Sequence, residues 1–135
     1  MTTKAGERND FDHEFWGKTT WKTMFIFALS YPWSNPDQAT RLHFSTFFTS
    51  LQGVIPCERC RKGYESFLVS NPLEPRLSSK IELLKWLICL YNNKRPAESR
   101  VNNLRDLTKK VVKPDKTVDE IIRQIKKSYP DLSFA

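Results

Sequence analysis

Apolar side chains recur every three to four positions over most of the chain, a period typical of amphipathic helices. The first such stretch covers residues 15–30 and ends at Tyr31-Pro32, because proline disfavours helical backbone in the residue before it. The second follows a cap at Asn35, has Pro36 at its first helical position and stops near Gly53. No stretch alternates apolar and polar residues as a half-buried strand would.

The helical pattern continues after the second stretch. A third helix is expected from Pro56 to Asn71-Pro72, and a fourth between a cap at Ser78 or Ser79 and Pro96. Together with the first two helices, these segments predict the four-helix core of a bundle.

The last third of the chain has a weaker pattern. Residues 101–112 are only weakly helical, whereas Thr117-Val118-Asp119-Glu120 is a capping-box pattern that opens a last helix. We therefore expect an all-α fold of about five helices, a four-helix core plus a C-terminal helix. We expect a flexible tail over residues 1–12 and a single domain over residues 13–135, with a basic extension from about residue 96.

Composition agrees with one compact domain. The chain has 135 residues, of which 39% are apolar and 27% charged, enough to bury a core without structural disulfides. No apolar run approaches the roughly 20 residues of a membrane helix, and the polar start MTTKAGERND lacks the apolar core of a secretory signal. These features predict a cytoplasmic protein without a membrane segment.

The formal net charge of +7 suggests an acidic partner, and positive residues are concentrated between Lys94 and Lys127. One hypothesis is a non-enzymatic basic module that binds nucleic acid or an acidic protein surface. No recognisable nucleic-acid motif accompanies the charge, however, so we expect no nucleic acid. A solvated basic face or a bound anionic cofactor would also account for the charge.

Three cysteines limit the possible chemistry. A zinc site of four cysteines is impossible within one chain, and a site of two cysteines and two histidines would need both His13 and His43, which lie far apart. We expect no metal, although a zinc site that two copies share through Cys57 and Cys60 stays open. Cys89 has no obvious partner and is expected to be a buried thiol.

The stretch IPCERC places Cys57 and Cys60 at the start of a helix. The positive end of the helix dipole, with Arg59, Arg61 and Lys62 nearby, favours a thiolate over a thiol. The pair is therefore a candidate redox centre, with two buried thiols spaced by chance as the alternative. A thioredoxin-like protein would require βαβ units, which this chain lacks.

A bound electron acceptor beside the pair would account for a CxxC on an all-α scaffold. The chain has four glycines and no GxGxxG, so any flavin must be held by helices, aromatic rings and cationic side chains. The candidate rings are Trp21, Phe25, Tyr31, Trp86 and Tyr91.

Three blocks of sequence resemble the Erv/ALR family of sulfhydryl oxidases. WGKTTW at residues 16–21, followed by Tyr31-Pro32, resembles the WGxxxW…YP opening of the family, and IPCERC is similar to its active-site CxxC. Ser79-Lys80, Trp86-Leu87 and Tyr91-Asn92 are similar to its S-R…W-L…H-N segment. The blocks span residues 16–95 in the order of the family and at about its spacing.

This resemblance implies a small helical bundle that holds FAD non-covalently, often as a homodimer. Such a protein is a thiol oxidase: it forms disulfides in a partner protein and passes the electrons through FAD to oxygen, giving hydrogen peroxide. The resemblance assigns Cys57 to attack by the substrate thiolate and Cys60 to the flavin side. The cofactor-binding residues that it implies are Gly17, Lys18, Trp21, Phe25, Tyr31, Trp86, Tyr91, Asn92, Lys94, Arg95 and Arg100.

Several of these positions depart from the family pattern. Phe25 and Tyr91 replace histidines, and both rings can still stack on adenine. Lys94 and Arg95 replace a V-N pair and can meet the FAD pyrophosphate by charge. Arg100 falls where members often have a lysine.

The shuttle cysteines that many cellular members carry near a terminus are absent from residues 1–15 and 94–135. We therefore expect the chain to pass disulfides to a separate thiol carrier, such as a thioredoxin-like or CxxC protein. This pared-down form resembles the oxidases of large cytoplasmic DNA viruses. That resemblance implies work in the host cytoplasm, at the virus assembly site or in the virion.

Overall fold

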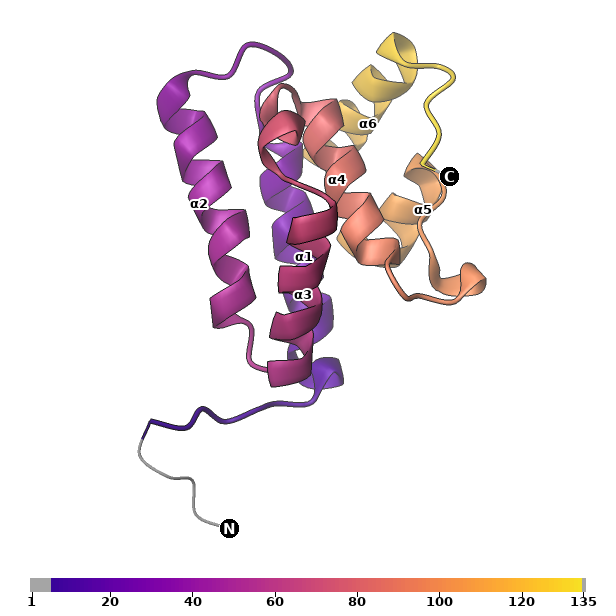
Figure 1. Ribbon diagram of the computed structural model, residues 1–135. Coiled ribbons are helices and arrows are strands. Elements are labelled where there is room, and N and C mark those ends of the chain that lie inside the picture. Colours follow the sequence, from indigo (N-terminus) through magenta and orange to yellow (C-terminus); the bar gives the residue numbers. More distant parts are fainter. Residues whose placement is uncertain (1–5, 135) are drawn as a thin grey trace.

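The computed structural model describes residues 6–134, and this part of the chain is helical without a strand (Figure 1). The all-α prediction is therefore confirmed. Four long helices form the larger part of the molecule: α1 (His13–Leu29), α2 (Gln38–Val54), α3 (Glu58–Ser70) and α4 (Lys80–Asn92). The remaining elements are the 3-10 turns η1 (Glu74–Leu77) and η2 (Ala97–Ser99), the short helix α5 (Leu104–Leu107), the π-helical turn η3 (Thr108–Val112) and α6 (Lys116–Ser128).

The helix starts depend on side-chain caps. Ser79 caps α4 as expected, since its hydroxyl accepts from the Glu82 amide at 3.2 Å. The predicted cap at Asn35 was wrong: Asn35 has a positive φ of 51°, and Asp37 caps α2 by accepting from the Thr40 amide. The observed cap therefore lies two residues after the predicted one.

The capping box predicted at Thr117 was also wrong. Asp115 is the N-cap of α6, and its Oδ1 accepts from the amides of Thr117 and Val118 at 2.8 and 3.2 Å. The helix consequently begins at Lys116, one residue before the predicted cap. The apolar side of α6 is as expected, with Val118 and Ile125 buried.

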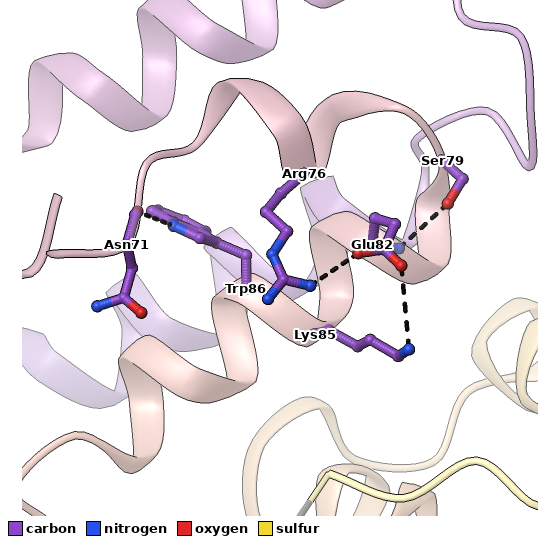
Figure 2. A network of polar contacts seen from close by, with 6 residues as sticks. All are labelled: Asn71, Arg76, Ser79, Glu82, Lys85 and Trp86. Carbon is purple, nitrogen blue, oxygen red and sulfur yellow. Dashed lines mark hydrogen bonds and ion pairs between the residues drawn. The ribbon is translucent and has the colours of Figure 1, made fainter.

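The core lies between two pairs of packed helices, α1 with α4 and α2 with α3. Trp86 of α4 is at its centre, 1% exposed, and its indole meets the rings of Phe48 and Phe67 edge-on at 5.7 and 5.8 Å. The indole N–H donates to the Asn71 carbonyl at 2.9 Å, within a network of polar contacts that joins α4 to η1 (Figure 2). Burial of large apolar rings of this kind is the main favourable contribution to folding.

The C-terminal elements pack on one side of this core, and η3 lies against α1 (Figure 1). This contact brings a basic part of the chain beside the first helix, which positions the pocket described below. No described helix is long and apolar enough to cross a membrane.

Candidate active site

The start of α3 carries a disulfide between Cys57 and Cys60, with their Cα atoms 5.1 Å apart. Cys57 is the N-cap, and its Sγ also accepts from the Cys60 amide at 3.2 Å. Both cysteines are partly exposed, and Cys60 also packs against the hydrophobic core. The Arg61 guanidinium stays beside the turn, because its Nη1 donates to the Ile55 carbonyl at 2.8 Å.

A pocket of about 410 Å³ lies between α1, α4 and η3, within the usual size range of ligand sites. Trp21 and Tyr91 form its aromatic part, with the rings edge-on at 5.0 Å, and the Arg95 guanidinium lies 3.8 Å from the centre of the Tyr91 ring. Five cationic side chains line the same pocket: Lys18, Lys22, Arg95, Lys110 and Lys113.

Gly17 is buried beneath the pocket wall, under the imidazole of His13. A Cβ at Gly17 would lie 2.7 Å from His13 Nδ1 and closer still to two other ring atoms. The His13 imidazole can lie this close to the backbone of α1 only because residue 17 has no side chain. His13 is exposed and lines the pocket, so its ring has room to move aside.

These features fit a planar cofactor that carries phosphates. Aromatic faces can stack on its rings, and the clustered ammonium and guanidinium groups can pair with a pyrophosphate. Carboxylates are sparse, since Glu14 is the one acidic residue that lines the pocket. The residues present therefore fit FAD.

Contacts join this pocket to the cysteine turn. The His13 ring meets the Trp16 ring edge-on at 5.0 Å, and the Trp16 indole donates to the Phe11 carbonyl at 3.0 Å. The Phe11 amide donates to the carbonyl of Pro56, the residue before Cys57, at 2.8 Å. The segment before α1 thus connects the pocket wall to the disulfide.

Of the eleven cofactor residues expected from the sequence, the structure brings Lys18, Trp21, Tyr91 and Arg95 together in the pocket, with Gly17 beside them. Phe25 lies behind the rings, fully buried, 5.8 Å from Tyr91. It supports the aromatic wall from the core.

Tyr31 and Trp86 are buried away from the residues that line this pocket. The Tyr31 hydroxyl donates to the Leu77 carbonyl at 2.6 Å, as the Trp86 indole does to Asn71. Burial raises the pKa of Tyr31, so the phenol stays a protonated donor. Both residues connect parts of the core.

Asn92, Lys94 and Arg100 are close in sequence to the pocket residues Tyr91 and Arg95 but do not line this pocket. The Asn92 side chain pairs with the backbone of Val101 in both directions, at 2.9 and 2.8 Å. Lys94 is exposed with a positive φ of 65°, and Arg100 donates from Nε to the Arg95 carbonyl at 2.7 Å. These contacts shape the connection that follows α4.

The sequence reasoning missed several residues of the pocket. Helical spacing could have found Lys22, which lies one turn after Lys18 on the same side of α1. Lys110 and Lys113 were predicted only as part of the basic extension. Because they line the pocket, part of the late positive charge lies beside Trp21 and Tyr91.

Cys89 corrects another expectation. It is exposed rather than buried, a free thiol in a shallow depression whose lining includes Lys85 and Arg100. The apolar side of α4 faces the core through Ile88 and Leu90, its neighbours in sequence, and this leaves Cys89 outside. Among the described residues, no group of three or more potential metal ligands is present.

Comparison with known proteins identifies the family of the chain. The sequence pattern of the Erv1/Alr family matches residues 18–114 of the chain. A probable FAD-linked sulfhydryl oxidase of Acanthamoeba polyphaga mimivirus is 40% identical over 80 residues, which cover 58% of this chain and 55% of the relative. The mitochondrial FAD-linked sulfhydryl oxidase ERV1 of Saccharomyces cerevisiae is 29% identical over 83 residues, or 62% of this chain and 42% of the relative.

The chain thus spans about half the length of these two relatives. Among solved structures, the crystal structure of the yeast Erv1 core superposes with a TM-score of 0.57 at 22% identity, over 98% of both chains. At this identity the match shows the shared helical fold.

Proposed function

This chain belongs to the Erv1/Alr family, and from that premise we propose that it is an FAD-linked thiol oxidase. It forms disulfides in partner proteins through Cys57 and Cys60. The observation that carries the proposal is the partly exposed disulfide at the start of α3 in a chain that also has a cationic, aromatic pocket on α1 and α4.

The reaction begins with thiol–disulfide exchange. A substrate thiolate attacks Sγ of Cys57, the Cys57–Cys60 bond breaks, and Cys60 leaves as a thiolate. A second substrate thiolate then attacks the substrate sulfur of this mixed disulfide, which releases the oxidised substrate and leaves both cysteines reduced. Two electrons and two protons have then left the substrate, and the amides at the helix start stabilise negative charge on sulfur.

The chemistry that FAD supplies when bound is acceptance of these two electrons and their transfer to oxygen, so that two thiols and one oxygen molecule give one disulfide and one hydrogen peroxide. Lys18, Arg95 and the neighbouring lysines would hold its pyrophosphate, and Trp21 and Tyr91 would contact its rings. With the exposed His13 ring moved aside, the missing side chain of Gly17 would let a flat ring lie against α1.

The thiol donor that we propose is a separate protein with a thioredoxin-like or CxxC site. Within these 135 residues, Cys89 is the only cysteine besides the pair, so the chain offers no second pair to relay the electrons. The proposed place of action is the cytoplasm, and the proposed assembly is a homodimer.

The first prediction tests the cofactor and the cysteine pair together. Purified protein is expected to be yellow with flavin absorbance, and to consume oxygen when a dithiol is added. Cys57→Ser and Cys60→Ser are each expected to abolish this consumption, because either change removes the bond that is exchanged. Oxygen-electrode traces and the visible spectrum are the measurements.

Cys89→Ser is the matched control and is expected to turn over at close to the wild-type rate, since Cys89 is exposed on another helix. A colourless protein that takes up no flavin on reconstitution would refute the oxidase. Activity retained in Cys57→Ser or Cys60→Ser would refute the exchange step.

A further inference from the structure

The segment before α1 lies across the turn between α2 and α3, next to the cysteine pair. Arg8 donates from its two terminal nitrogens to the carbonyls of Gly53 and Val54, at 2.5 and 3.0 Å. Phe11 and Pro56 add the backbone hydrogen bond already described. These contacts hold residue 10, which lies between them in sequence, at the start of α3.

Asp10 uses that position to cap the helix that carries the disulfide. Its Oδ2 accepts from the Glu58 amide at 2.9 Å, and Glu58 directly follows Cys57. Cys57 Sγ accepts from the Cys60 amide in the same first turn. A carboxylate and the reactive sulfur therefore share one helix N-terminus.

We propose that Asp10 is a positioning residue that sets how readily the Cys57–Cys60 pair is reduced. Reduction of the disulfide takes up two electrons and one proton to give one thiolate and one thiol. The disulfide is neutral, whereas the reduced pair carries a negative charge, which the helix N-terminus stabilises. A carboxylate at the same end repels that charge and raises the free energy of the reduced pair.

The charge of Asp10 is therefore expected to lower the reduction potential of the Cys57–Cys60 pair. With Asp10 in place, the pair is a weaker oxidant of incoming thiols and gives up its electrons more readily once reduced. A thiol oxidase needs this second property, because its reduced pair must pass electrons on. Only the benefit to electron transfer rests on the proposed function. The effect of the Asp10 charge on the reduction potential of the Cys57–Cys60 pair does not depend on oxidase activity.

Other charged groups at the turn act alongside Asp10. The guanidinium groups of Arg8 and Arg61 are fixed on backbone carbonyls, and Lys62 pairs with Glu58 at 3.4 Å. Arg59 is exposed in the first turn of α3. Asp10 differs from all of these because its charged atom accepts directly from the amide next to Cys57.

The experiment measures the reduction potential of the pair in glutathione buffers without oxygen, in the full chain as purified, by trapping thiols with an alkylating reagent. Asp10→Asn keeps an oxygen that can accept from the Glu58 amide but removes the charge. At a pH where the reduced pair holds a thiolate, we expect the equilibrium to shift toward the reduced form by about threefold to tenfold, equivalent to about 15 to 30 mV for a two-electron couple.

Asp12→Asn is the matched control. Asp12 belongs to the same segment and is also exposed, but it caps α1 by accepting from the Glu14 amide at 2.9 Å. The same loss of one carboxylate is therefore expected to leave the potential at the wild-type value. The shift in Asp10→Asn should also shrink at high salt, because exposed charges are screened.

A potential for Asp10→Asn equal to that of the wild type would overturn the proposal and leave Asp10 a structural cap only. A shift of the same size in Asp12→Asn would overturn it as well, since any nearby charge would then suffice. The readout does not need turnover, so a chain without oxidase activity that still shows the shift would refute the proposed function and retain the role of Asp10.

Discussion

Two buried tyrosine hydroxyls connect segments that lie far apart in sequence. Tyr31, at the end of α1, donates to the Leu77 carbonyl, and Tyr64 of α3 donates to the Phe48 carbonyl of α2, each at 2.6 Å. Burial raises the pKa of both phenols, which keeps them protonated and able to donate. Each hydrogen bond satisfies a carbonyl that water cannot easily reach.

Tyr31→Phe is therefore expected to lower the free energy of unfolding by about 1 to 3 kcal/mol, because the buried Leu77 carbonyl loses its donor. Flavin absorbance of the folded protein should stay unchanged, since Tyr31 does not line the pocket between α1 and α4. Urea unfolding is the measurement, with Tyr129→Phe at an exposed tyrosine as the control. Loss of flavin from folded Tyr31→Phe protein would contradict a purely structural role for Tyr31 and would make it a cofactor-binding residue.

Gly17 gives a second prediction at the residue scale. Gly17→Ala places a Cβ against the His13 imidazole, which can move only by shifting within the pocket. We expect less bound flavin per chain but no loss of thermal stability of the flavin-free protein, because alanine favours a helix by about 1 kcal/mol over glycine. The visible spectrum and a thermal melt measure the two quantities.

Gly63→Ala is the control, because a Cβ at Gly63 of α3 meets no atom within 4 Å. It should keep the wild-type flavin content. Adding His13→Ala to Gly17→Ala should restore flavin binding if the displaced imidazole is the obstacle. Unchanged flavin content in Gly17→Ala would show that the cofactor does not use this surface.

At the scale of helices, the sequence predicted those features of the long helices that depend on residues close together in the chain. The four long helices were predicted from apolar spacing and from prolines, and the end of α3 at Asn71 agrees with the expectation from Pro72. The third helix begins at Glu58, two residues after the predicted start at Pro56. Two predicted caps were wrong because several polar residues compete at each. Asp37 and Asp115 are the N-caps in place of Asn35 and Thr117, because their carboxylates accept from first-turn amides in the folded chain.

The region after α4 could not be predicted in the same way. Lys94 and Lys113 adopt positive φ values of 65° and 62°, which side-chain-bearing residues rarely do, and a π-helical turn comes before Lys113. The pairing of Asn92 with the Val101 backbone and the packing of η3 on α1 impose this conformation. Such contacts are tertiary, so no local pattern encodes them.

The residues of the candidate site also fall into those that local sequence predicts and those that depend on tertiary packing. Cys57, Cys60 and the aromatic rings of α1 and α4 could be predicted from helical spacing and from a known motif. Lys110, Lys113 and the cap at Asp10 could not, because they reach the site only through chain segments packed from elsewhere. We expected a flexible tail over residues 1–12, and in the structure Arg8, Asp10 and Phe11 form hydrogen bonds with the α2–α3 turn and the start of α3. Residues 1–5 of this segment lie outside the described part of the chain.

On the scale of the molecule, large apolar side chains remain exposed on α1 and α2, the first two helices of the chain. Ile26 and Phe27 of α1 are 40% and 42% exposed, and Leu42 of α2 is 64% exposed. Phe27 also meets Phe47 of α2 edge-on at 5.3 Å, whereas Ile26 lines a depression together with Val118 of α6. The resemblance to the family predicts that a second copy of the chain covers exposed apolar side chains, and its contacts at Phe27 would remove this ring from water.

Phe27→Glu is expected to convert a homodimer into a monomer, because a carboxylate tolerated at an exposed position of the monomer would be buried without a partner in the dimer. Light scattering after size-exclusion chromatography should give about twice the chain mass of 15.9 kDa for the wild type and a single chain mass for the variant. Val69→Glu, at a 79% exposed apolar residue of α3, is the control and should remain dimeric. A wild-type chain that is monomeric at all concentrations would refute the dimer, whereas a dimeric Phe27→Glu variant would move its interface away from α1.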